Sequence, residues 1–118
     1  MTATLQHITF DCDDALAVAT FWSATLDRDL DPDGSRHFAS IGLGGAAPAP
    51  AWLFVHVPER KSVKNRTHVD LSAPDPETEI ERLVGLGAVR IADVEESGAR
   101  WTVLHDPEGN EFCMAQGV

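Results

Sequence analysis

The sequence predicts an α+β protein built from two tandem βαβββ modules, whose strands form a curved, barrel-like mixed sheet around a cleft. The main observation is a weak internal repeat, in which the segment starting at His7 is patterned like the segment starting at His68. Both segments open with alternating apolar and polar residues and continue into an amphipathic helical pattern. The length of 118 residues fits one domain, residues 1–118, and not two independent ones.

The strand that opens each module is predicted from its strict alternation. In the first module Ile8 and Phe10 point to one face, and their counterparts Val69 and Leu71 do the same. The polar residues between them occupy the opposite face, and each polar set begins with a histidine. We expect the first of these strands over about residues 5–11.

A helix follows each strand, and an aspartate marks where it begins. Asp13 or Asp14 can cap a helix over about residues 14–26. In the second module Asp75 is followed by a proline and an acidic residue, which is typical of a helix N-terminus. That helix runs to about Leu86, where the next residue is a glycine that ends it.

Further strands follow each helix. In chain order they are expected at about residues 36–43, 51–57, 88–94, 100–105 and 111–115. A shorter strand near Leu30 would complete the first module, about residues 1–57. The glycine-, proline- and alanine-rich residues 42–50 predict a loop, residues 58–66 link the modules, and the second module covers about residues 67–118.

Composition excludes several classes of partner. The formal net charge is −10, whereas nucleic acids and anionic membranes require a positively charged surface. No stretch approaches the roughly 20 apolar residues of a transmembrane helix, and the N-terminal residues lack a secretory signal pattern. We therefore expect a cytoplasmic protein with no nucleic-acid or membrane partner, in which Cys12 and Cys113 are reduced, buried thiols.

Polar residues at alternate strand positions predict a ligand cleft. His7 and His68 occupy equivalent repeat positions, so a pseudo-twofold arrangement would bring them together. The turn DPEGN delivers Glu111 onto the last strand. Two imidazoles and a carboxylate form a facial triad suited to Fe, Mn, Zn or Ni, with positions left open for a substrate. Each residue taken alone also fits a plainer interpretation as a solvent-exposed strand residue.

Four of the nine basic residues lie within seven positions. They are Arg60, Lys61, Lys64 and Arg66. The first interpretation is structural, with Asn65 and Arg66 holding the linker in place. The second is that Lys64 or Arg66 binds an anionic ligand, for which a guanidinium is well suited. The third is that the cluster relieves an acidic surface, through exposed pairs that contribute about 0–1 kcal/mol each.

Aromatic residues and histidines on two strands are further candidates for the cleft. Trp52 and His56 share one face of their strand, and Trp101 and His105 share one face of theirs. If these faces line the cleft, it suits a flat apolar ligand, with His56 and Trp101 as substrate contacts. The tryptophans fit a hydrophobic core or a dimer interface more readily. His37 is assigned no role.

Three features together carry a resemblance to a known family: the repeated βαβββ pattern, the paired histidines, and the segment DPEGNEFC before the last strand. With them, nearly the whole chain resembles the vicinal oxygen chelate superfamily, which contains glyoxalases, bleomycin-resistance proteins and extradiol dioxygenases. Within it, HITFDC, VPERKSVKNRTHVDL and DPEGNEFC are similar to single-domain glyoxalase-like proteins of actinobacteria.

The resemblance implies a metal site. His7, His68 and Glu111 match the first-strand and last-strand positions at which members hold a divalent ion, here Zn, Ni, Fe or Mn. The remaining position lies in AWLFVHV, where glyoxalases carry an acid and this chain has none, with His56 as the nearest donor. A three-ligand site, or no metal, therefore fits better than a four-ligand glyoxalase I site.

Two functions follow from the resemblance. In the first, a metal binds two vicinal oxygens of a small molecule and Glu111 takes part in catalysis, as in a lyase or isomerase. An extradiol dioxygenase fits less well, because those enzymes usually add a tyrosine and this chain has none. In the alternative, the protein binds a drug-like or aromatic molecule without a metal. Exposed sheet edges predict a homodimer in either case.

Overall fold

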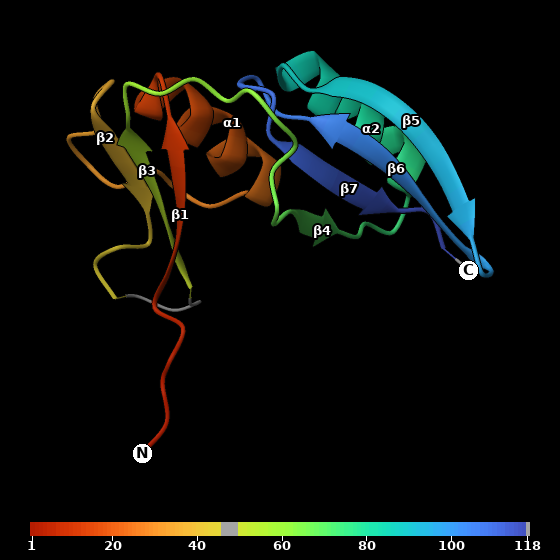
Figure 1. The fold of residues 1–118 in the computed structure, drawn as a ribbon, viewed down its shortest axis with the longest axis horizontal. Helices are drawn as coiled ribbons and strands as arrows, with labels where there is room; N and C mark the ends of the chain where they lie inside the picture. The colour runs from red at the N-terminus through yellow and green to blue at the C-terminus, as the bar shows by residue number, and fades with distance from the viewer. Residues whose placement is uncertain (46–49, 118) are drawn as a thin grey trace. The chain divides into compact units, whose positions relative to one another are not determined.

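The computed structural model describes residues 1–45 and 50–117, so the end of the expected loop at 42–50 lies mostly outside the described residues. The chain divides into two compact units, Met1–Arg60 and Lys61–Val118. Each has one helix and one mixed sheet, which confirms the α+β class (Figure 1). The description as one domain stays a prediction.

The first unit is built on a three-stranded sheet. In chain order its elements are β1 (His7–Cys12), α1 (Ala15–Leu26), β2 (Phe38–Ile41) and β3 (Ala51–His56). Strand β3 lies in the centre, parallel to β1 and antiparallel to β2. Leu30 forms an isolated bridge to Ile41 in place of the short strand expected there. Among the described residues the first unit is therefore βαββ, and the predicted βαβββ module is not confirmed for this half.

Helix α1 begins where the sequence indicates. The Asp14 carboxylate caps it by accepting a hydrogen bond from the Ala17 N–H at 3.1 Å. The helix buries Trp22 completely, with its ring centroid 5.3 Å from that of Trp52 and 5.6 Å from that of Phe10. Since Trp52 is also buried, the interpretation of Trp52 as a core residue is confirmed.

The second unit has the full βαβββ pattern. Its elements are β4 (Val69–Leu71), α2 (Pro76–Leu86), β5 (Val89–Glu96), β6 (Ala99–His105) and β7 (Glu111–Ala115). The strand order is β4-β7-β6-β5, with β4 parallel to β7 and the other pairs antiparallel. The described strands thus form two open sheets, and the expected barrel-like closure is not seen.

Helix α2 follows the predicted capping pattern. The Asp75 carboxylate accepts hydrogen bonds from the Thr78 N–H at 3.3 Å and from its hydroxyl at 2.9 Å. Gly87 ends the helix with φ 121°, a conformation that side chains with a Cβ rarely adopt. Ile80 and Leu83 are buried, as the apolar stripe of the helix requires.

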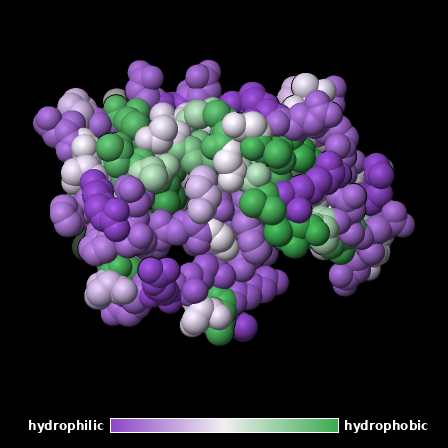
Figure 2. Space-filling model, turned by 90° about the horizontal axis from the view of Figure 1, so that it is seen from above, coloured by the Kyte–Doolittle hydropathy of each residue, from purple (hydrophilic) through white to green (hydrophobic). Residues whose placement is uncertain are grey.

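Most of the face in Figure 2 is hydrophilic, with hydrophobic residues exposed in places. On the second unit the exposed hydrophobic side chains include Val84, Leu86, Val89 and Ile91. Neither helix in the described ranges has the length and hydropathy needed to cross a bilayer.

Candidate functional site

A cavity of about 630 Å³ opens on one face of the sheet in the second unit. Its apolar wall is formed by Ala99, Trp101, Val103 and Ala115. Its polar groups are Lys64, His68, Asp70, Arg100, Glu111 and Cys113. The volume lies within the roughly 300–1,000 Å³ typical of small-molecule sites, which also combine an apolar wall with a few polar groups.

Strand alternation separates the cavity from the core. On β6 and β7, Trp101 lies opposite Ala115 and Val103 lies opposite Cys113, and these residues face the cavity. The residues between them are buried on the other face, with Leu104 at 0% exposure. A period of two residues along each strand therefore supplies both a hydrophobic core and a ligand-facing surface.

Glu111 begins β7, and both of its carboxylate oxygens accept hydrogen bonds. Oε2 lies 2.9 Å from the Lys61 Nζ, and Oε1 lies 3.0 Å from the Asn65 backbone N. Burial by itself raises the pKa of Glu111, but these donors outweigh burial and lower the pKa to about 2. At neutral pH the carboxylate is therefore ionised, and the ammonium group of Lys61 balances its charge.

The turn before β7 fixes the position of Glu111. Asp106 is buried, and its Oδ1 accepts hydrogen bonds from the N–H groups of Glu108 and Asn110, both at 2.9 Å. The Asn110 side chain donates to Asp106 Oδ2 and accepts from the Asn65 side chain, also at 2.9 Å. Asn65 therefore ties the basic linker to this turn, which supports the structural interpretation of that stretch.

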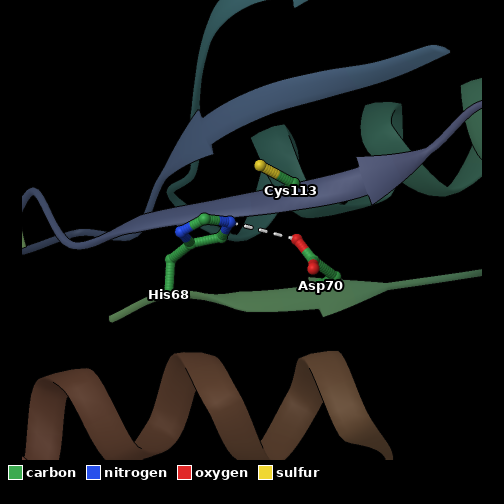
Figure 3. Close-up of side chains that lie close together, drawn as sticks. All are labelled: His68, Asp70 and Cys113. Carbon is green, nitrogen blue, oxygen red and sulfur yellow. Dashed lines mark ion pairs between the residues drawn. The ribbon is translucent and has the colours of Figure 1, made fainter. Parts of the chain in front are cut away.

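Three side chains of the types that bind metals lie together in the cavity lining. His68 Nε2 is 3.3 Å from Asp70 Oδ1, and one ligand atom from each of His68, Asp70 and Cys113 lies within 4.8 Å of the others. Figure 3 shows the imidazole of His68 facing the Asp70 carboxylate along β4, with Cys113 on the neighbouring β7. Burial, together with the Asp70 carboxylate, raises the pKa of the Cys113 thiol.

Of the predicted metal ligands, His68 and Glu111 both line this cavity. His7 begins β1 in the first unit and is exposed. The triad of His7, His68 and Glu111 therefore stays a prediction, as does the catalytic role of Glu111.

Of the predicted substrate contacts, Lys64 and Trp101 line the cavity. Arg66 is exposed and does not belong to the lining. His56 lies in the first unit, where its Nδ1 is 2.7 Å from the Asp13 carbonyl oxygen and its ring packs edge-on against His37 at 5.7 Å. The substrate roles of all four residues stay predictions.

The sequence reasoning missed Arg100, Asp70 and Cys113 as cavity residues. Asp70 and Cys113 lie directly opposite each other in the parallel β4–β7 pair. A signal was present for Asp70, which alternates onto the exposed face of β4, whereas Cys113 is buried and its strand shows no such alternation. Alternation does not show which residues of two distant strands are paired, so the contact could not be found without the register.

Comparison with known proteins places this geometry in a family. The profile of the glyoxalase-like domain matches residues 7–115. The chain belongs to the glyoxalase-like domain family. The match includes all the strands and both helices of the two units. A search of the curated proteins finds no match to this glyoxalase-like chain.

Solved structures share the glyoxalase-like fold. A glyoxalase/bleomycin resistance protein/dioxygenase family enzyme from Burkholderia phytofirmans is 19% identical with a TM-score of 0.73, covering 96% of this chain and 98% of that one. The bleomycin-binding protein of Streptomyces verticillus is 20% identical with a TM-score of 0.62 and full coverage of both chains. The fosfomycin resistance protein FosX from Mesorhizobium loti is 16% identical with a TM-score of 0.71, covering 100% of this chain and 95% of that one. At these identities the likeness shows the fold.

Proposed function

We propose that this glyoxalase-like protein binds a small, partly flat and apolar molecule with an anionic group in the cavity of its second unit. The observation that carries the proposal is the cavity itself, with its volume of about 630 Å³ and its apolar wall around Trp101. Lys64 and Arg100 line the same cavity and supply positive charge for an anionic group.

The contacts of Glu111 favour a binding role over family-type metal chemistry. A divalent ion on this carboxylate has to displace the Lys61 ammonium, 2.9 Å away, and the Asn65 N–H. The lysine also repels a second cation at that position. The residues around Glu111 therefore fit a metal poorly, and no reaction step is assigned to an ion held there.

The names of two structural neighbours are consistent with binding. One was solved in complex with copper(II)-bleomycin, and another is a fosfomycin resistance protein. Both names concern ligands other than macromolecules, and the cavity of the second unit lies in the size range of small-molecule sites. At 20% and 16% identity they support the class of ligand and leave its structure open.

The binding proposal is tested with a panel of aromatic carboxylates and their neutral amides. We expect carboxylates to raise the melting temperature more than their amides, since a bound ligand stabilises the folded state. Trp101→Ala is expected to weaken the affinity by roughly tenfold, because an aromatic wall is lost. Lys64→Gln should weaken the affinity for carboxylates by about tenfold and leave the affinity for amides unchanged.

Arg82→Gln is the matched control, since Arg82 pairs with Glu79 on α2 and does not line the cavity. Equal affinities of the wild type and the Trp101→Ala variant would contradict binding in this cavity. A preference for amides over carboxylates would contradict the anionic group.

A lyase or isomerase that uses a metal on His7, His68 and Glu111 is the second candidate. It is favoured by one observation, that His68 and Glu111 both line the cavity. Metal analysis of the wild type and of Glu111→Gln separates the two candidates. Stoichiometric Zn, Ni, Fe or Mn that is lost in the variant would support the second candidate, and its absence in the wild type would remove it.

We also propose that the protein forms a homodimer and that it is located in the cytoplasm. Within the family, we propose that it is most similar to the actinobacterial members. The dimer is supported by the exposed hydrophobic residues of α2 and β5, among them Val89 and Ile91 at 55% and 47% exposure. Light scattering on the wild type and on Ile91→Lys tests it, with a dimer expected for the first and a monomer for the second. A monomeric wild type at tens of micromolar would remove the dimer proposal.

A further inference from the structure

We propose that His68, Asp70 and Cys113 form a metal site of their own, for zinc or a similar divalent ion, in the wall of the cavity. The ligand set differs from the predicted triad, because it uses a thiolate and a second carboxylate and needs neither His7 nor Glu111. All three side chains belong to the second unit, so the site is complete within Lys61–Val118.

Strand pairing brings the three ligands to one place. Asp70 and Cys113 are direct partners in the parallel β4–β7 pair. His68 precedes Asp70 by two residues and therefore projects from the same side of the strand. The backbone of two hydrogen-bonded strands thus sets the spacing of the site, and such elements hold ligands more firmly than loops do.

The distances are close to those of a tetrahedral zinc site. Zinc bond lengths place neighbouring nitrogen, oxygen and sulfur ligands roughly 3.3–3.7 Å apart. His68 Nε2 and Asp70 Oδ1 are already 3.3 Å apart, and the three ligand atoms lie within 4.8 Å of one another. Closing the remaining gap of about 1 Å requires rotation of side chains that are 41% and 73% exposed, while the buried Cys113 stays in place.

The chemistry of the donors selects the ion. Imidazole, carboxylate and thiolate are the three ligand types of protein zinc sites. One thiolate and one carboxylate balance the double charge of the ion, and the proton of the Cys113 thiol is released to solvent when the metal binds. Lys64 lines the same cavity and opposes a cation, so its charge lowers the affinity.

Three protein ligands leave a fourth position for a small molecule. Because all three residues line the cavity, that position lies toward the space where a ligand is proposed to bind. An anionic oxygen of the ligand can fill it. This last step rests on the proposed function, whereas the metal site itself does not.

Cobalt titration tests the site, because Co²⁺ replaces zinc and reports thiolate ligation by a charge-transfer band in the near ultraviolet. The wild type is expected to show this band at one equivalent of Co²⁺ and to lose it when zinc is added. Cys113→Ser is expected to abolish the band. Asp70→Asn should weaken cobalt affinity by more than about tenfold, the scale seen even for residues that only support ligands.

Matched controls separate this site from others. Cys12→Ser removes the other buried thiol, which lies in the first unit, and should leave the band unchanged. His7→Ala and Glu111→Gln should also leave it unchanged. Cobalt that still binds Cys113→Ser but no longer binds His7→Ala or Glu111→Gln would assign the metal to the predicted triad and overturn this inference.

Absence of a thiolate band in the wild type would also overturn the inference. Circular dichroism verifies that each variant is folded, and Asp70→Asn decides the matter if Cys113→Ser does not fold, since Asp70 is exposed. Repeating the carboxylate panel on chelator-treated protein keeps the two proposals apart. Ligand binding that persists without metal leaves the proposed function intact even where the metal site fails.

Discussion

The two units share a repeat pattern, yet among the described residues only the second unit brings an imidazole, a carboxylate and a thiol close together, at His68, Asp70 and Cys113. The repeat offset of 61 residues matches His7 with His68 and Thr9 with Asp70. The strand registers extend this match to the partner strands, where Leu53 lies opposite Thr9 and Cys113 lies opposite Asp70. The repeat therefore copies the backbone frame and the histidine, but not the aspartate and the cysteine beside it.

The same comparison locates the first-unit counterpart of Glu111. The strand partner of Ile8 is Trp52, and the partner of its repeat counterpart Val69 is Phe112. Glu111 precedes Phe112 by one residue, so its counterpart is Ala51, which has no donor atom. His56, at the far end of that strand, does not occupy this position. The difference shows that the sequence repeat is informative about folding and uninformative about chemistry unless the register is known.

The largest expected effect compares the helix cores of the two units. Trp22 and Leu83 are repeat counterparts, and both are fully buried on their helices. Trp22→Ala should lower the free energy of unfolding by about 3–5 kcal/mol and Leu83→Ala by about 2–5 kcal/mol, through lost apolar contacts and a residual cavity. Urea denaturation measures both. A loss below about 1 kcal/mol at either position would show that the site relaxes by repacking.

A smaller effect is expected at the turn before β7 in the second unit. Asp106→Ala removes the acceptor of two N–H groups and leaves the Asn110 side chain without this partner. Each buried donor left unsatisfied costs about 1–3 kcal/mol, so urea denaturation should show a loss in that range or above it. The exposed Glu81→Gln is the control. An unchanged free energy of unfolding in Asp106→Ala would show that water replaces the carboxylate.

The pH dependence of stability tests the Lys61–Glu111 pair. The pKa of Glu111 is lowered to about 2 in the folded protein, below its value of about 4.3 in an unfolded chain. The pair therefore contributes stability above pH 4.3 or so, and this contribution is lost as the pH falls toward about 2. Lys61→Gln should raise the pKa of Glu111, as measured by NMR titration of its carboxyl carbon. No rise would show that the Asn65 N–H, and not the lysine, holds the carboxylate.

The smallest effect is expected at an exposed ion pair that serves as the contrast. Arg82 and Glu79 are 2.7 Å apart on α2 with side chains 44% and 26% exposed, whereas Lys61 and Glu111 are 25% and 11% exposed. Arg82→Gln should change the free energy of unfolding by no more than about 0.5 kcal/mol, since solvent screens the pair. Thermal unfolding at low and high salt measures this. A change in the free energy of unfolding above about 1 kcal/mol would show that solvent does not screen the exposed Arg82–Glu79 pair.

Local features of the fold could be predicted from the sequence, because they depend on neighbouring residues. The caps Asp14 and Asp75 and the alternation of β1 and β4 are of this kind. That Leu30 makes a single bridge and not a strand could not be predicted, since no local pattern distinguishes the two. Two residues of the cavity, His68 and Glu111, could be expected from the sequence, because the repeat and the DPEGN turn single them out. Their partners Cys113 and Lys61 depend on contacts between distant segments.

Strand β4 has three residues and is hydrogen-bonded on one side, to β7. Its partner lies more than 40 residues further along the chain, so we expect the β4–β7 pair to close after α2 and the β5–β6 hairpin have formed. A short edge strand is also the element that opens most readily in the native state, and its amide protons should exchange fastest among those of the second sheet. A metal or ligand that joins β4 to β7 would slow that exchange. Occupancy of the site is thus coupled to the order of the strand that carries it.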